Sequence, residues 1–361
     1  MVWLLGTSGV GKSTVGWELL KVLESSGVRA AYIDADQLRL TSGIDTSESE
    51  LIAAGLASVT QGYRASDAQL LIVAGLLDDD DHLRRILPDT PRENVLSVHL
   101  HATNQTIRQR VTDRGWLVEL ADESIEYAAK LDPNFADMSS DTTDMTPDEV
   151  ACSLLESALV LTSRRPAFAV QQAAEPPPAQ ATQVVVITGP TGIGVSTIGF
   201  ETFTHLANAG EKVGYLDSNQ LGIVGATPRD DDLAYLRALN SGAVANEFSQ
   251  HGVRTVVVGA DPHAAAAMNL AWTTDAVTGI WLDASEYEIA NRLEARARGK
   301  GPPIAGDDRR GLTRLALSEA INTSIAQARD RRRLAPPDSE VITTNDRSPA
   351  QIAEQICRTT T

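Results

Sequence analysis

"GTSGVGKS", residues 6–13, fits the phosphate-binding pattern G-x-x-x-x-G-K-[ST] at every fixed position. The apolar run from Met1 to Leu5 precedes this stretch, and a helix-like segment from Ser13 to Ser25 follows it. A glycine-rich loop between a strand and a helix lets backbone N–H groups and the helix N-terminus point at a phosphate. The stretch therefore predicts a nucleotide-binding loop (P-loop), and a glycine turn without a ligand is the less favoured interpretation.

Two side chains of this loop have predicted chemical roles. The Lys12 ammonium is expected to reach the β- and γ-phosphate oxygens, and the Ser13 hydroxyl is expected to ligate Mg²⁺. The predicted nucleotide-binding residues of the loop are Gly6, Thr7, Ser8, Gly9, Val10, Gly11, Lys12, Ser13 and Thr14.

A second, altered copy of the loop, "GPTGIGVS", occupies residues 189–196. An offset of 183 residues places Gly189 on Gly6 and also places "YLDSNQL" (215–221) on "YIDADQL" (32–38) without a gap. Further along, "QLLIVAG" (69–75) and "RTVVVGA" (254–260) are apolar runs typical of buried parallel strands. The sequence therefore predicts a tandem duplication.

Strands alternating with helices in each copy predict two tandem doubly wound parallel-sheet α/β domains, with ligands at the carboxyl ends of the strands. The predicted first domain covers residues 1–162, and the predicted second domain covers residues 183–361. Between them, residues 163–182 are rich in proline and alanine and include three successive prolines, which suits a semi-rigid linker.

The composition excludes several classes of protein. A formal net charge of −17 and a pI near 4.8 argue against a nucleic-acid surface, and the absence of a long apolar run argues against a membrane protein. Cys152 and Cys357 are too few for a disulfide framework, and we expect both to be packed on terminal helices. A first strand at residue 2 leaves no room for a signal peptide, so a cytoplasmic location is expected.

The second predicted strand ends in "IDADQLR", residues 33–39, and here the chain resembles the P-loop small-molecule kinases. It is most similar to adenylylsulfate kinase, whose segment reads D-G-D-N-V-R, and shikimate and gluconate kinases share the paired acids. Asp34, Asp36 and Arg39 match the two acids and the arginine. The resemblance implies the nucleoside-monophosphate-kinase-like P-loop NTPase fold, ATP and Mg²⁺ as cofactors, and γ-phosphate transfer to a hydroxyl of a small metabolite.

The resemblance also implies roles for these three residues. One aspartate accepts the proton of the substrate hydroxyl, the other holds Mg²⁺ or its water, and Arg39 contacts the substrate. We assign Asp36 to the proton and the substrate and Asp34, with Ser13, to the metal, and we leave the reverse assignment open. With Lys12, the two aspartates are the predicted catalytic residues.

Two further segments resemble nucleotide-binding parts of this family. Arg110 and Arg114 lie one helical turn apart before "GWLVELADES" (115–124), where the family carries a lid whose arginines clamp phosphates. A solvated helix face is the alternative interpretation of these arginines. The turn "SDTTDMTP" (140–147) resembles the adenine-side loop, so Thr143 is a predicted nucleotide contact.

The chain also departs from the family pattern. The third predicted strand lacks a Walker B acid, and "VAGLLDDDD" (73–81) replaces the expected loop after it, so adenylylsulfate is disfavoured as the acceptor. The four aspartates at 78–81 are interpreted as the acidic start of a helix and not as a metal cluster, because acids stabilise a helix N-terminus.

The second copy has lost the residues to which chemistry is assigned. It has Val195 for Lys12, Asn219 for Asp36 and Gly222 for Arg39, while Ser196 and Asp217 remain. We therefore expect a pseudokinase domain with a structural or regulatory role, paired with the first domain inside the chain. Weak nucleotide binding by this domain and a homo-oligomer both stay open.

Two functions compete at this point. The first is a metabolite kinase with its chemistry in the first domain. The second is a nucleotide-binding switch or assembly ATPase without a metabolite substrate. The "DADQLR" segment favours the kinase, because a switch has no need of a substrate-side aspartate and arginine.

Overall fold

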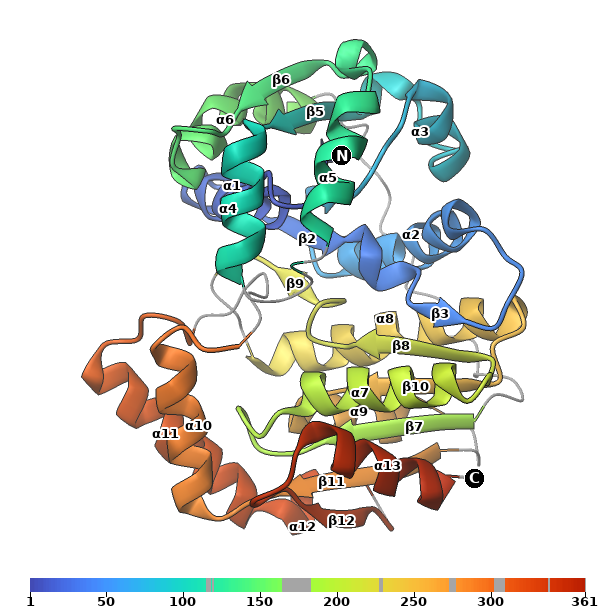
Figure 1. Ribbon diagram of the computed structural model, residues 1–361, viewed down its shortest axis with the longest axis vertical. Coiled ribbons are helices and arrows are strands. Elements are labelled where there is room, and N and C mark those ends of the chain that lie inside the picture. The colour runs from blue at the N-terminus through green and yellow to red at the C-terminus, as the bar shows by residue number, and fades with distance from the viewer. Residues whose placement is uncertain are drawn as a thin grey trace.

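The computed structural model describes residues 1–114, 118, 120–163, 183–226, 230–272, 277–301, 309–336 and 338–360. These residues form two six-stranded sheets with helices packed on both faces (Figure 1). Residues 1–163 are called the N-terminal half below, and residues 183–360 the C-terminal half. Of the predicted linker, residues 163–182, residue 163 ends a helix and residues 164–182 lie outside the described residues, so the predicted domain boundaries stay a prediction.

The sheet of the N-terminal half has the order β6-β5-β1-β4-β2-β9, and that of the C-terminal half the order β12-β11-β7-β10-β8-β3. Within each half all the strand pairs are parallel. The predicted pair of parallel α/β sheets is confirmed. The strands are β1 Val2–Leu5, β2 Ala30–Asp34, β3 Thr41–Ser42, β4 Leu70–Ala74, β5 Leu96–His101, β6 Met138–Asp141, β7 Gln183–Thr188, β8 Val213–Asp217, β9 Ile223–Val224, β10 Thr255–Gly259, β11 Val277–Asp283 and β12 Glu340–Thr343.

The helices follow the strands as expected for this architecture. The N-terminal half has α1 Lys12–Ser25, α2 Glu48–Ala65, α3 Asp80–Ile86, α4 Asn104–Arg114, α5 Leu120–Lys130, α6 Pro147–Ser163 and the 3-10 turns η1 Ala35–Leu38, η2 Arg92–Asn94 and η3 Pro133–Phe135. The C-terminal half has α7 Val195–Asn208, α8 Asp230–Gln250, α9 Pro262–Ala271, α10 Glu286–Ala297, α11 Arg314–Arg329, α12 Arg331–Leu334 and α13 Pro349–Thr360. Among the described residues, no helix is long and apolar enough to cross a membrane.

Each β-strand sends alternate side chains to two different cores, because successive residues of a strand point to opposite faces. Val2 and Leu4 of β1 pack into a core with α1 and α6, whereas Trp3 and Leu5 pack into a second core. That second core is shared by the two halves. It contains Trp3, Leu5, Ile33, Leu56 and Val59 from the N-terminal half and Val184, Val186, Leu216, Leu236 and Phe248 from the C-terminal half.

The two halves exchange edge strands, which the sequence did not reveal. β3 of the N-terminal half pairs antiparallel with β8 of the C-terminal half, and β9 pairs antiparallel with β2 in return (Figure 1). Under the 183-residue offset the two pairings are equivalent, since Thr41 faces Gly214 and Val224 faces Ala31. Each half therefore completes its sheet with a segment of the other.

Some local expectations can be compared with the structure directly. Asp79 caps α3 by accepting a hydrogen bond from His82 N at 2.6 Å, with Asp80 and Asp81 in the first turn, so the acidic helix start is confirmed. The expectation for the cysteines was half wrong. Cys357 is buried on α13, but Cys152 is exposed on α6, because it lies outside the face that packs on α1.

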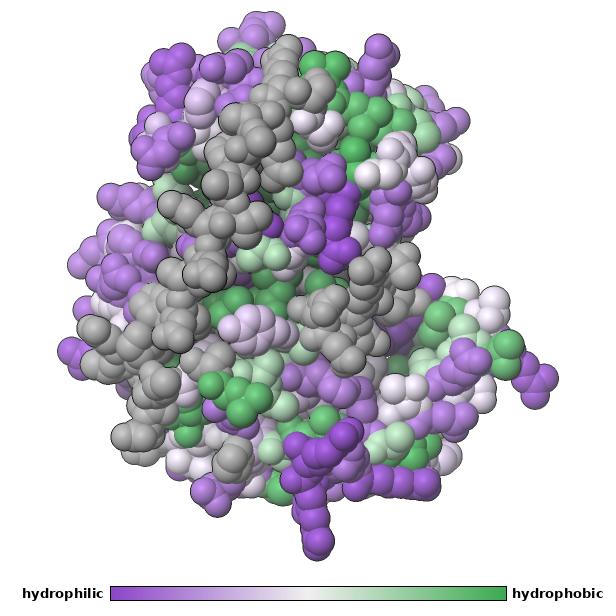
Figure 2. All heavy atoms as spheres, turned by 180° about the vertical axis from the view of Figure 1, so that it is seen from behind, coloured by the Kyte–Doolittle hydropathy of each residue, from purple (hydrophilic) through white to green (hydrophobic). Residues whose placement is uncertain are grey.

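Polar residues predominate on the surface of the molecule, and most large apolar residues are buried. Hydrophilic residues form much of the outline of the face shown in Figure 2, and apolar residues lie in separate areas within it. Most large apolar side chains are instead found in the three buried clusters. The apolar surface that would join the halves is therefore covered in the intact chain.

Residues 1–165 expressed alone should be less stable than the full chain, because the N-terminal part of the shared core, β3 and the β2 edge that β9 covers would be exposed to water. Thermal unfolding of this fragment beside the full chain measures the effect. An equal midpoint for the fragment and the full chain would contradict the shared-core description.

Candidate functional site

The P-loop connects the end of β1 to the start of α1 as the sequence predicts. Gly6, Gly9 and Gly11 adopt φ values of +133°, +87° and +96°, a region that favours glycine. At Gly6 a Cβ atom would lie 2.2 Å from the carbonyl oxygen of Leu100, so a side chain does not fit there. Gly11 is the N-cap of α1 and gives no side-chain cap to its first turn. The N–H groups of this turn are therefore suited to phosphate oxygens.

Lys12 lies against its own loop. Its Nζ donates to the carbonyl oxygens of Gly6 at 2.8 Å and Thr7 at 3.0 Å. Thr7 in turn donates its hydroxyl to the carbonyl oxygen of Ser124 on α5 at 2.7 Å. The ammonium group is thus held beside the loop that would receive a polyphosphate.

Ser13 and Asp34 come together as a pair of oxygen ligands. The Ser13 hydroxyl donates to Asp34 Oδ2 at 3.1 Å, and Asp34 Oδ1 accepts from the backbone N–H of Asp36 at 3.1 Å. Burial raises the pKa of the Asp34 carboxyl to about 6, and the charge of Asp36 adds to the shift, while Lys12 opposes it. Mg²⁺ is usually held by one or two carboxylates together with phosphates and waters, so this pair fits such an ion.

The described residues contain no group of three or more His, Cys, Asp or Glu side chains that could hold a metal by themselves. This agrees with the donor set at Asp34 and Ser13, which provides two oxygens and would leave other positions for phosphate and water.

Asp36 and Arg39 form a second cluster next to Asp34. Arg39 Nε donates to Asp36 Oδ1 at 2.7 Å, and the same guanidinium also forms an ion pair with Glu48 at the start of α2. The Asp36 side chain is 55% exposed, so its carboxylate remains accessible to a hydroxyl from solvent. Sequence reasoning missed Glu48. The Ser47–Glu50 capping box marks the helix start beside it and was the available signal.

Arg110 is bonded to protein atoms in this structure. Its guanidinium donates to the carbonyl oxygen of Thr142 at 2.6 Å, to the Thr142 hydroxyl at 3.0 Å and to the carbonyl oxygen of Val10 at 3.5 Å. Arg292 makes the equivalent bonds to Thr344 and Ile193 in the C-terminal half, which lacks the lysine. The arginine therefore ties the P-loop to the loop after β6 or β12, and a direct phosphate contact stays a prediction.

The other two predicted nucleotide contacts are less defined. The Thr143 hydroxyl accepts from the backbone N–H of Thr103 at 3.0 Å, so this residue lies between the loops that follow β5 and β6. The side chain of Arg114 and part of the predicted lid, residues 115–117 and 119, lie outside the described residues.

The altered loop of the C-terminal half keeps its backbone shape but is filled by protein. Gly192 and Gly194 have φ values of +82° and +105°, similar to their counterparts. The backbone N–H of Thr191 donates to the side chain of Gln327 at 2.9 Å, and Ser324 donates to the Thr191 carbonyl at 2.7 Å, both from α11. A helix thus occupies hydrogen-bonding groups of this loop.

The region of the C-terminal half that corresponds to Asp36 and Arg39 is packed by other side chains. A Cβ atom at Gly222 would lie 2.3 Å from Arg237 Cγ, so a side chain from α8 fills the space beside this glycine. Arg237 pairs with Asp261 at 3.0 Å. Asp217 stays buried, and burial raises its pKa while Ser196 opposes the shift.

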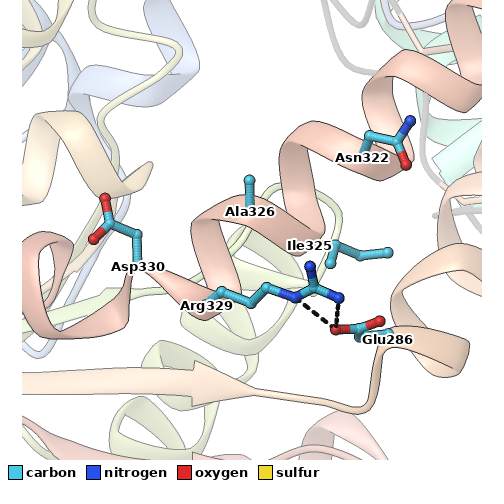
Figure 3. Close-up of a pocket in the computed structure, with 6 residues that line it drawn as sticks. All are labelled: Glu286, Asn322, Ile325, Ala326, Arg329 and Asp330. Carbon is cyan, nitrogen blue, oxygen red and sulfur yellow. Dashed lines mark hydrogen bonds and ion pairs between the residues drawn. The ribbon is translucent and has the colours of Figure 1, made fainter.

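A hollow of about 620 Å³ lies at a distance from these groups, between α10 and the end of α11 (Figure 3). Arg329 pairs with Glu286 across it, with an N–O distance of 2.6 Å. None of the predicted site residues lines this hollow, so it is not part of the candidate site.

The loop, its lysine and the Ser13–Asp34 pair on a parallel sheet define a P-loop nucleotide-binding protein. More narrowly, residues 1–114 match the family model of adenylylsulphate kinase. The N-terminal part of the chain is therefore related to the P-loop small-molecule kinases, as the resemblance implied. No match to a curated protein is found for this sequence.

Several solved structures are similar to about half of the chain. A sugar kinase from Janibacter sp. HTCC2649 is 18% identical, with 46% of this chain and 95% of that chain covered and a TM-score of 0.33. A gluconokinase from Sinorhizobium meliloti 1021 is 19% identical (45% and 91% covered, TM-score 0.32). Shikimate kinase from Acinetobacter baumannii, in complex with shikimate, is 21% identical (46% and 94% covered, TM-score 0.31).

The raised pKa of Asp34 gives a test without any ligand. Between the ordinary aspartate pKa of 3.8 and the raised pKa of about 6, the folded protein keeps a proton on Asp34 that the unfolded chain has released. The stability from this carboxyl is therefore complete below 3.8 and is lost as pH rises through about 6. Denaturant unfolding of the metal-free wild-type protein and of Asp34→Asn should be measured across this pH range. The free energy of unfolding should fall less with rising pH in the variant. An equal dependence of the unfolding free energy on pH in the two proteins would contradict the raised pKa of Asp34.

Proposed function

We propose that the chain is an ATP- and Mg²⁺-dependent phosphotransferase that acts on a hydroxyl group of a small metabolite. The chemistry takes place in the N-terminal half. The observation that carries this proposal is the pair of linked clusters at the end of β2. Asp34 is bonded to Ser13 of the P-loop, and Asp36, two residues away, is bonded to Arg39. A nucleotide side and an acceptor side thereby adjoin each other.

Residues 6–14 would bind the phosphates of ATP, with Lys12 on the β- and γ-phosphate oxygens. Ser13 and Asp34 would bind the metal. ATP would supply the phosphoryl group, and Mg²⁺ would neutralise the charge that develops on it. Holding the phosphates next to the acceptor side keeps the two reacting groups in line, which is the main way in which such sites accelerate transfer.

Asp36 would receive the proton of the attacking hydroxyl. Its carboxylate is exposed, lies on the acceptor side and is oriented by Arg39. A positioned general base of this kind contributes typically 10²–10⁴-fold to a rate, so Asp36 accounts for a large share of turnover in this proposal. Arg39 is proposed to contact the acceptor itself, together with its partner Glu48.

The remaining parts of the proposal concern organisation. Residues 1–162 would form the catalytic domain, and residues 183–361 a pseudokinase domain that lacks Lys12, Asp36 and Arg39 equivalents. Both would have arisen by tandem duplication. We propose a cytoplasmic protein with a small-molecule partner and without a nucleic-acid or membrane partner.

The test is a phosphorylation screen of hydroxyl-containing metabolites with the full chain, Mg²⁺ and γ-labelled ATP. The proposal expects label in an organic product with wild-type protein and none with the Asp36→Asn variant. Release of labelled inorganic phosphate alone, with no phosphorylated metabolite across the library, would instead support the switch or assembly ATPase.

A further inference from the structure

We propose that the C-terminal half positions the acceptor side of the N-terminal site, by holding the segment that contains Arg39 and the helix that contains Glu48. This inference rests on the proposed function, because it assigns these residues to the acceptor. It gives the half without catalytic residues a defined task in the reaction, that of a positioning element.

The first contact fixes the backbone directly after Arg39. The backbone N–H of Tyr215 donates to the carbonyl oxygen of Leu40 at 2.8 Å, and the next two residues form β3 against β8. The Leu40 side chain packs against the core of the C-terminal half. Residues 40–42 are therefore part of the other half's sheet and core, and Arg39 is the last residue before this anchor.

The second contact fixes the partner of Arg39. Glu48 begins α2, which packs along α8. At the other end of α2 the Tyr63 hydroxyl donates to the carbonyl oxygen of Leu221 at 2.9 Å, and Asn240 of α8 donates to the same oxygen at 2.6 Å. Besides Asp36, two residues position Arg39: its anchored neighbour Leu40 and its ion-pair partner Glu48. Both of these depend on the C-terminal half.

The direct hydrogen bonds of the P-loop stay within the N-terminal half. Lys12 bonds within its own loop, Thr7 bonds to α5, and Arg110 bonds the loop to Thr142. All of these partners belong to the N-terminal half. Loosening the contact of β3 with β8 alone should therefore disturb the acceptor side while MgATP binding persists.

The reciprocal contact, made by β9, shows why the proposed positioning of an acceptor is expected in the N-terminal half only. β9 pairs with β2 in the same way, and Ile223 packs into the core around α1 and α6. The residue before Ile223 is Gly222, which has no side chain to present to an acceptor. The exchange is kept in both directions, but only the strand donated by the N-terminal half follows an arginine.

Gly43 is the position at which this contact can be weakened without touching the site. It has φ +77°, and a Cβ atom there would lie 2.8 Å from the backbone oxygen of Glu211, in the turn that leads into β8. Gly27 is a matched control, because it has φ +79° and nothing within 4 Å of its Cβ position. Alanine at either glycine adds the same backbone strain, and only alanine at Gly43 also pushes against the C-terminal half.

The experiment compares Gly43→Ala and Gly27→Ala in the full chain by three measurements. These are hydrogen exchange of residues 36–44, MgATP affinity by calorimetry, and the KM for the acceptor identified in the screen. We expect faster exchange and a KM raised on the order of tenfold in Gly43→Ala only, since small displacements at a reacting site have effects of this size or larger. MgATP affinity should match in both variants.

Equal exchange and equal KM in the two variants would overturn the inference, and so would a parallel loss of MgATP affinity in Gly43→Ala. Tyr63→Phe serves if Gly43→Ala does not fold, because it removes one hydrogen bond between the halves and should change the same measurements in the same direction. If wild-type protein phosphorylates no metabolite, the proposed function fails, while hydrogen exchange still decides whether the C-terminal half holds residues 36–44.

Discussion

Replacing Lys12 with alanine is expected to abolish γ-phosphate transfer by the full chain. The ammonium group is held at the P-loop by the carbonyls of Gly6 and Thr7. In the proposed function it stabilises the charge on the transferred group. Loss of one preorganised group of this kind typically lowers kcat by ~10²–10³-fold. Turnover of labelled ATP measures the effect, and Lys21→Ala is the control because Lys21 is a surface lysine of the same helix.

Restoring a lysine in the second loop should not rescue the Lys12→Ala variant. In the double variant Lys12→Ala/Val195→Lys, Thr191 of the second loop is still bonded to Gln327. The C-terminal half also still has Asn219 in place of Asp36 and Gly222 in place of Arg39. Full activity of Lys12→Ala, or recovery in the double variant, would contradict the assignment of chemistry to the N-terminal half.

Asp36→Asn is expected to lower turnover by about 10²-fold or more while MgATP affinity is retained, which is the size of effect typical for removal of a general base. The asparagine oxygen can still accept the hydrogen bond from Arg39, so the local structure is preserved. Initial rates together with calorimetric titration of MgATP separate the two effects. Asp45→Asn is a suitable control, since Asp45 is an exposed aspartate of the same segment.

The same measurements on Asp34→Asn decide which of the two aspartates accepts the proton and which holds the metal. Asp34→Asn should raise the Mg²⁺ concentration required for activity, because Asp34 is the carboxylate bonded to Ser13. If Asp36→Asn instead raises the Mg²⁺ requirement and Asp34→Asn loses turnover at saturating Mg²⁺, the two roles are reversed.

Much of the site could be predicted because its signals are local in sequence. The P-loop has fixed positions, the paired acids follow a strand at a set distance, and apolar runs mark the parallel strands. The bond between Ser13 and Asp34 and the bond between Asp36 and Arg39 join residues that were singled out for these reasons.

The contact between the halves could not be predicted in this way. β3 and β9 are two residues long, too short to show the alternation that marks a strand, and their partners lie far away in sequence. Likewise, nothing near Thr191 in sequence indicates that Gln327 bonds it, and Glu48 contacts Arg39 only because α2 folds back towards η1. These features depend on packing between segments and have no local pattern.

The number of MgATP sites in the full chain tests the central claim most directly, because that claim places one working nucleotide site in the N-terminal half. Calorimetric titration should give one site per chain, lost in Lys12→Ala and unchanged in Ser196→Ala, since Ser196 is the Ser13 counterpart in the filled loop. Two sites of similar affinity, or one site that survives Lys12→Ala and disappears with Ser196→Ala, would contradict the account.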